Sequence, residues 1–344
     1  MPVGAFGGFQ PDSVIVFCCH SVSELWYCLF ICLIVPLQSV CQETISMAKI
    51  LWSAVKEEIH QGYNLRKSLF PKISKHFENR YVVSFYTRFD SRIGINDYDA
   101  EMLNTLLGGS NKAKKAKLLL MINSPGGDPL AAEKIIKVLS EFSGNDYWVI
   151  VPGVAKSAAT MICLGASRII LSPISELGPI DLQVDRGGSS LASTYSIITA
   201  YDKLMEKGIN LGQDRRIEPI LQQLQEFRAS EIEYFRRVNN LSSDIAEKVL
   251  KRGMLKDSTI EEIKELIKIF IDPEKSKVHG RPIYYSDLKE VDGKGSFSLQ
   301  LVDMTSSVWR DLTEYHTRAT THFQVSKTGK ILESEENSFS ASGD

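Results

Sequence analysis

The stretch "YWVIVPGVAKSAATMICLGASRIIL", from Tyr147 to Leu171, decides the fold class of this chain. It opens with an unbroken apolar run, which is typical of a strand covered on both faces. After a Pro-Gly turn and Ser157, small and apolar residues predict a packed helix that ends near Gly165. A second apolar strand, "RIIL", follows directly. Strand, helix and strand in this order predict parallel strands joined by a crossover helix.

The same pattern continues upstream of this stretch. "KLLLMIN" (117–123) predicts another buried strand, and Pro129 begins a predicted helix because proline suits the first helical turn. "YVVSFYT" (81–87) predicts a further strand, and Asn96 or Asp97 is expected to cap the helix that follows it. The expected fold class is therefore α/β with a mostly parallel sheet. The expected regions are an apolar N-terminal segment (1–46), an N-terminal helical region (47–80), an α/β core (81–188), a helical region that completes the domain (189–323) and a polar, disordered tail (324–344).

Composition excludes several classes of protein. The 344 residues carry a formal net charge of only −2, so the chain is not expected to bind nucleic acid. The lysines from 112 to 117 are interpreted as a solvated loop. Of the cysteines, only Cys163 follows Met47, and no CxxC pair or His/Cys metal spacing occurs, which indicates a reducing compartment and no metal or disulfide framework.

The N-terminal segment has two interpretations. "LWYCLFICLIVPL", from Leu25 to Leu37, is strongly apolar, yet it is shorter than the about 20 residues that a membrane-spanning helix needs. If it spans a membrane, the first basic residues follow it, so the body would face the cytoplasm. Alternatively, translation starts at Met47, where "MAKILWSAVKEEI" begins an amphipathic helix, and the protein is cytoplasmic.

Two glycine-containing turns follow successive buried strands. Ser124-Pro125-Gly126-Gly127-Asp128 follows the first, and Pro152-Gly153 leads to Ser157 after the second. Ligands bind at this edge of an open parallel sheet. Ser157 is either a simple helix N-cap or a nucleophile, in which case the main-chain N–H groups of Gly127 and Ala158 would hold an oxyanion. A phosphate site competes with this interpretation, but GxxxxGK[ST] and GxGxxG are both absent from the sequence.

Three motifs resemble the serine dehydrogenase proteinase family, a part of the Clp/crotonase superfamily that also contains Clp-type proteases and signal peptide peptidases. They are "INSPGGDPLAAEKI", "VPGVAKSAATMICLGA" and "SELGPIDLQV". The resemblance is strong over residues 80–184 and weaker to about 323. It implies a spiral of ββα units, a homo-oligomer, serine peptidase activity and frequent membrane association. It places the nucleophile on Ser157 and the oxyanion donors on Gly127 and Ala158.

The general base is left open by the sequence. A Clp-type triad has a histidine in the region that here reads Gly178-Pro179-Ile180-Asp181-Leu182, and this region contains none. Lys156 is one candidate, if burial lowers its pKa, although a structural lysine is the alternative interpretation. His279 is the other candidate, with Asp181 as an acid that orients it. The remaining histidines of the body, His316 among them, are interpreted as structural.

The functional prediction is a serine peptidase that forms an acyl-enzyme on Ser157, acts on a peptide or protein, and needs no cofactor. Two alternatives remain. One is a catalytically inactive oligomeric scaffold or peptide-binding member of the fold, which the missing histidine favours. The other is a crotonase-like enzyme acting on acyl thioesters, whose chemistry would not need the serine.

Overall fold

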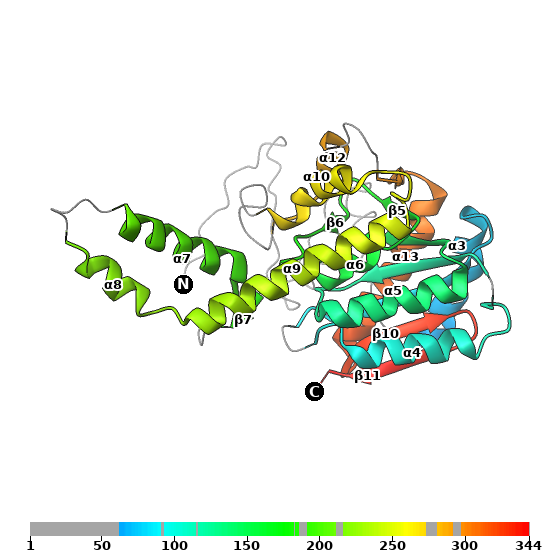
Figure 1. The fold of residues 1–344 in the computed structure, drawn as a ribbon. Helices are drawn as coiled ribbons and strands as arrows, with labels where there is room; N and C mark the ends of the chain where they lie inside the picture. Colours follow the sequence, from blue (N-terminus) through cyan, green and yellow to red (C-terminus); the bar gives the residue numbers. More distant parts are fainter. Residues whose placement is uncertain are drawn as a thin grey trace, which may run out of the picture. The chain divides into compact units, whose positions relative to one another are not determined.

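The computed structural model describes residues 62–90, 93–114, 116–181, 183–185, 191–210, 216–272, 281–291 and 297–343. The chain divides into the units Met1–Ala54 and Val55–Asp344, and the described residues all belong to the second. In these residues the main sheet has the order β11 (Ser338–Ser342), β10 (Thr328–Ser334), β1 (Tyr81–Thr87), β2 (Leu118–Asn123), β3 (Tyr147–Val151), β5 (Arg168–Leu171), β9 (Leu299–Leu301) (Figure 1). The strands from β1 to β9 in this order are parallel, and β10 and β11 are antiparallel. The predicted α/β fold with a mostly parallel sheet is confirmed.

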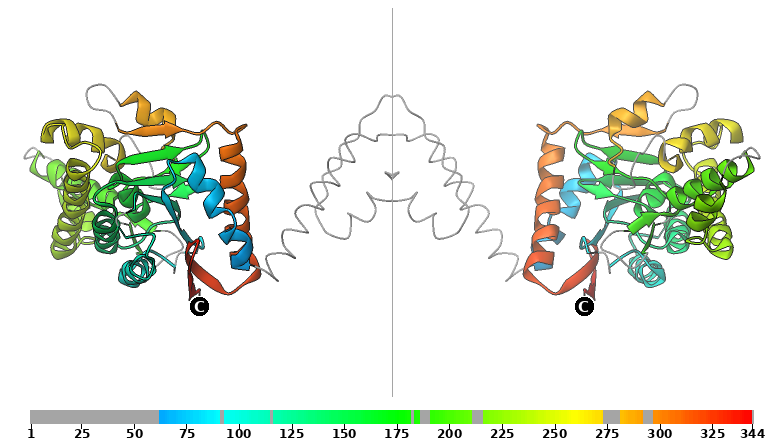
Figure 2. Two further views of the ribbon diagram at one scale, coloured as in Figure 1. Left: turned by 90° about the vertical axis from the view of Figure 1, so that its right-hand side faces the viewer. Right: turned by 90° about the vertical axis from the view of Figure 1, so that its left-hand side faces the viewer.

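Helices cover both faces of this sheet (Figure 2). One face carries α4 (Asp97–Gly108), α5 (Pro129–Ser143), α6 (Ala158–Leu164), α9 (Ala229–Arg252) and α10 (Ile260–Ile271), and the other carries α3 (Phe70–His76) and α13 (Ser307–Val325). Because side chains alternate along a strand, Val83 and Phe85 of β1 enter the first apolar cluster, whereas Val82 and Tyr86 enter the second. Burial on both faces explains why these strands are apolar throughout.

Local signals set the helix ends near the candidate site. Asn96 forms a capping box with Asp99 at the start of α4. The Asp128 carboxylate accepts from Leu130 N at the start of α5, and Pro129 occupies the first turn. Gly144 ends α5 in the left-handed conformation, with φ +64°. The starts of α4 and α5 agree with the boundaries that the sequence predicts.

Short elements extend the fold beyond the carboxyl edge of the sheet. β4 (Val154–Ala155) pairs in parallel with β6 (Glu176–Leu177), and Leu177 pairs in turn with Ile283, just before α12 (Tyr285–Glu290). β7 (Gln183–Asp185) and β8 (Leu191–Ser193) form an antiparallel pair that leads into α7 (Thr194–Ile209). α7 packs on α9 and on α8 (Glu218–Leu224). The elements that carry the candidate site therefore follow directly on the strands of the main sheet.

The prediction of a disordered tail at 324–344 is wrong. These residues complete α13 and form β10 and β11, and β10 pairs antiparallel with Val83–Thr87 of β1. The buried Glu333 carboxylate explains the order, because it accepts hydrogen bonds from Arg66 (2.7 and 2.8 Å), Tyr315 (2.8 Å) and Ser338 (2.9 Å). The residues that bind β10 lie far away in the sequence. The polar composition of 324–344 therefore gives a wrong prediction of disorder.

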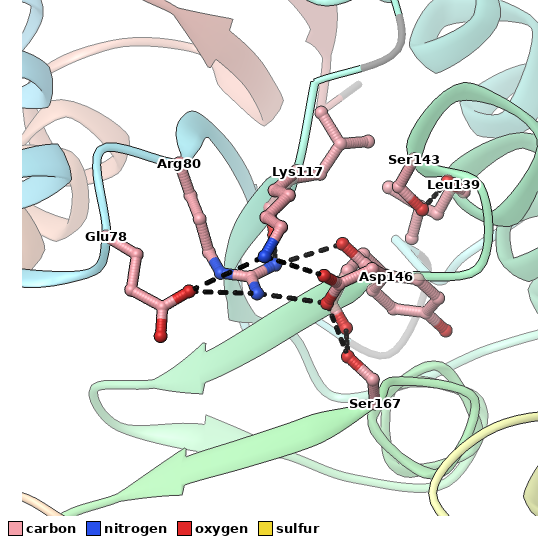
Figure 3. Close-up of polar contacts among 9 residues, drawn as sticks. Glu78, Arg80, Lys117, Leu139, Ser143, Asp146 and Ser167 are labelled. Carbon is pink, nitrogen blue, oxygen red and sulfur yellow. Dashed lines mark hydrogen bonds and ion pairs between the residues drawn. The ribbon is translucent and has the colours of Figure 1, made fainter.

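A cluster of ion pairs lies at the amino-terminal edge of the sheet (Figure 3). The buried Arg80 guanidinium donates to Asp146 (2.9 Å) and lies 3.7 Å from the centre of the Trp148 ring. Lys117 lies 3.5 Å from Asp146, and the Ser167 hydroxyl donates to the same carboxylate. These contacts join the starts of β1, β2, β3 and β5.

No helix in the described part of the chain is long and apolar enough to cross a membrane. The apolar run from Leu25 to Leu37 lies outside the described residues.

Candidate active site

Ser157 combines a strained backbone with a hydroxyl that does not cap its helix. It occupies the N-cap position of α6, yet its side chain makes no cap hydrogen bond. Its φ of +50° and ψ of −121° lie in a region that residues other than glycine rarely adopt, at a cost of about 1–3 kcal/mol. The simple N-cap interpretation of Ser157 is therefore not supported by the geometry. A serine on a strained turn between a strand and a helix is the arrangement that exposes a nucleophile.

Main-chain hydrogen bonds hold the chain immediately before Ser157. Ser124 N donates to Val154 O (2.9 Å), and Lys156 N donates to Ser124 O (3.1 Å). The end of β2 is thereby joined to β4. The two glycine turns that the sequence places at one sheet edge therefore lie side by side.

The diglycine turn lies directly against the serine. A Cβ atom on Gly126 would come within 2.7 Å of Ser157 Cβ and 3.2 Å of Ala158 N, so only glycine permits this approach. The neighbouring Gly127 pairs with Ile95 through Ile95 N to Gly126 O (2.7 Å) and Asp128 N to Ile95 O (2.9 Å). This pairing does not engage the N–H of Gly127. Ala158 N–H belongs to the first turn of α6, where N–H groups have no acceptor within the helix.

Lys156 is held by the segment that follows β5. Its ammonium donates to Leu177 O (3.0 Å) and forms an ion pair with Glu176 (3.0 Å). Its methylene chain lies over Gly178, where an added Cβ would meet Lys156 Cδ at 2.4 Å. The lysine is thus held on the strand that β4 pairs with.

The other sequence-predicted residues lie elsewhere or outside the described ranges. Asp181 is half-buried, and its carboxylate accepts from the Ser193 hydroxyl (2.5 Å) at the end of β8. His279 lies outside the described residues. The structure therefore brings Ser157, Lys156 and the residues of the diglycine turn together, and it joins Asp181 to β8.

Sequence reasoning missed two contacts around these turns. Glu176 forms an ion pair with Lys156. The sequence held one signal for this pair, because the only charged residues between 152 and 180 are Lys156, Arg168 and Glu176. His316 on α13 packs against Gly153, where an added Cβ would meet its Cε1 at 2.8 Å. Burial lowers the pKa of His316, so it fills this space as a neutral ring. No sequence signal links α13 to this turn.

Comparison with known proteins matches part of the chain to a family. Residues 91–235 match the family of ClpP-like SDH-type serine proteinases, a span that includes the diglycine turn, Ser157 and Asp181. This region therefore resembles that family. The family resemblance that the sequence motifs carry is confirmed.

The individual relatives share only parts of the chain. Uncharacterized proteins MJ0137 and MJ1495 of Methanocaldococcus jannaschii are each 35% identical, over 107 and 88 residues. The matches cover 28% and 26% of this chain, and 36% and 28% of those proteins. Two solved structures are variants of the 1510-N membrane-bound stomatin-specific protease. A serine-to-alanine variant is 19% identical over 41% of this chain and 66% of that chain, with a TM-score of 0.26. A lysine-to-alanine variant in complex with a substrate peptide is 17% identical over 69% and 96%, also with a TM-score of 0.26.

Proposed function

We propose that this chain is a serine peptidase in which Ser157 is the nucleophile. The observation that carries the proposal is the strained Ser157, whose hydroxyl makes no cap hydrogen bond and whose Cβ lies against the diglycine turn. In the first step Ser157 Oγ attacks a peptide carbonyl carbon, its proton passes to a base, and the carbonyl oxygen becomes an oxyanion. The amine leaves with a proton, and water then hydrolyses the acyl-enzyme.

The N–H groups of Gly127 and Ala158 are the proposed oxyanion donors. The Gly126 contact with Ser157 and Ala158 supports this, because it brings the turn and the start of α6 together at the nucleophile. Both N–H groups are free of the local pairing described above. Each such donor contributes about 3 kcal/mol to lowering the barrier.

For the base we propose His279, oriented by Asp181. The pairing of Leu177 with Ile283 supports this, since the chain shortly after His279 is hydrogen-bonded beside the residue that binds Lys156. Lys156 is the alternative base that the sequence leaves open.

The proposed substrate is a peptide or protein, and the proposed assembly is a homo-oligomer, as the family resemblance implies. For location we keep two proposals: membrane association through the apolar run at 25–37 with the body in the cytoplasm, or a cytoplasmic protein that starts at Met47. Fractionation of the full chain, followed by N-terminal sequencing, separates the two.

A fluorophosphonate probe tests the peptidase, because it labels only an activated serine. We expect the assembled wild-type protein to be labelled, the label to map to Ser157, and Ser157→Ala to abolish it. Ser140→Ala, which changes a half-buried serine of α5, is the matched control and should label as wild type. An assembled wild-type protein that is not labelled would instead support the scaffold alternative.

A further inference from the structure

The residues around Ser157 are connected to the strand segment 176–178 by two side chains. Lys156, the residue before the serine, binds Glu176 and Leu177 O, each at 3.0 Å. Its side chain is 14% exposed and that of Glu176 is 30% exposed, so solvent screens this ion pair only in part.

Thr160, three residues after the serine, makes the second connection. Its buried hydroxyl donates toward Ala155 O (2.7 Å) and Gly178 O (3.0 Å), and Gly178 N donates to it (3.1 Å). Together Lys156 and Thr160 hold both sides of Ser157 against one segment. A backbone conformation that costs about 1–3 kcal/mol persists only where its surroundings determine it, and these contacts supply that constraint.

We propose that Glu176 is a positioning residue for Ser157, and that Lys156 acts with it as a structural cation and not as the base. This inference rests on the proposed function. Glu176 holds the ammonium against Leu177 O, which keeps Lys156 over Gly178 and fixes the main chain from which Ser157 projects. The contacts of Lys156 favour this role, because the ammonium donates to a carboxylate and a carbonyl, whereas a base must accept the serine proton.

The test compares Glu176→Gln, Lys156→Met and the double variant by the rate of fluorophosphonate labelling, measured where all proteins remain folded. A displacement of about 1 Å at a reacting group costs about 100-fold in rate, so we expect losses of about 10-fold for Glu176→Gln and 10- to 100-fold for Lys156→Met. The double variant should be labelled no more slowly than Lys156→Met alone, because both substitutions break the same connection between Lys156 and Glu176. The midpoint of the pH dependence should stay at its wild-type value in each variant.

Glu141→Gln is the matched control, since it breaks the exposed pair of Lys137 and Glu141 in α5 and should label as wild type. Three results would overturn the inference: wild-type labelling of Glu176→Gln, additive losses in the double variant, or a shifted pH midpoint. Loss of labelling in Lys156→Met to the level of Ser157→Ala would assign the base to Lys156 and overturn it as well.

Hydrogen exchange separates this inference from the proposed function. Lys156 N and Ala159 N are hydrogen-bonded on either side of Ser157, to Ser124 O and Lys156 O. We expect their exchange to accelerate in Glu176→Gln, even in a protein that the probe does not label. If the wild-type protein is not labelled but exchange is faster in Glu176→Gln, the peptidase proposal alone is wrong. If exchange is unchanged in Glu176→Gln, the positioning role of Glu176 is wrong.

Discussion

Replacing Gly126 with alanine tests the packing of the diglycine turn on the nucleophile. An alanine Cβ at this position would lie 2.6 Å from Lys156 O and 2.7 Å from Ser157 Cβ. To restore an ordinary contact of 3.4 Å, the turn and the serine must separate by about 0.8 Å. The φ of Gly126, +105°, also strains the backbone of any L-residue that carries a side chain, whereas glycine adopts it freely.

The expected result is a large loss of activity with a modest loss of stability. A shift of this size at the reacting group costs about 100-fold in rate, while the backbone strain costs about 1–2 kcal/mol of unfolding free energy. Labelling by the fluorophosphonate probe and urea unfolding measure the two effects separately. Gly144→Ala is the matched control, because Gly144 also has a positive φ, of +64°, but an added Cβ meets nothing within 4 Å.

Gly144→Ala should therefore lose similar stability and keep wild-type labelling. If Gly126→Ala also labels at the wild-type rate, the turn does not contact the working serine and the proposed oxyanion site is wrong. If both variants lose labelling equally, the loss follows from stability and carries no information about the site.

Two further predictions concern ion pairs in the sheet. Glu333→Gln should lower the unfolding free energy by about 3–5 kcal/mol, because it leaves the buried Arg66 guanidinium without its counter-charge; a loss below about 1 kcal/mol in urea unfolding would contradict this. At Asp146, burial acts to raise the pKa of the carboxyl, but the hydrogen bond and charge of Arg80 lower it below its usual value overall. The carboxylate therefore stabilises the fold fully above its unfolded pKa of about 3.9, and this contribution is lost as the pH falls toward the lower folded pKa. Asp146→Asn should be less stable than wild type at pH 7, and the difference should shrink below about pH 4; a constant difference would refute the assignment.

The sequence predicts the parallel part of the fold because its signals are local. The strands Tyr81–Thr87 and Tyr147–Val151 are observed with the predicted bounds, since each is an apolar run between turn residues. Asn96 and Asp128 cap helices as their positions suggest. Where a structural feature depends on local contacts, residue type and spacing are sufficient to predict it.

The missed features depend on contacts between distant residues. Arg66 and Glu333 are 267 positions apart, and their pairing, not local composition, orders β10. His316 reaches Gly153 only because α13 lies across the sheet. Predicting these contacts requires the register of the whole sheet.

The candidate site was predicted in part for the same reason. The order of strand, turn and helix predicts that Ser157 and the diglycine turn lie at the same sheet edge, because parallel strands end at one edge. The contacts of Lys156 could not be predicted, because they depend on the pairing of β4 with β6, two strands of only two residues each. Such short strands have no periodic pattern of their own.

The strain at Ser157 is supported by the burial of the helix that follows it. All seven residues of α6 are buried, and Met161, Ile162 and Leu164 are each at most 1% exposed. Burying a side chain of this type contributes about 1.5–3 kcal/mol, so these residues together exceed the about 1–3 kcal/mol that the serine backbone costs. The conformation of Ser157 is therefore set by how α6 docks on the core and by its ties to 176–178, not by the preference of serine itself. A substitution that loosens α6, such as Met161→Ala, should accordingly reduce the reactivity of Ser157 without touching the hydroxyl.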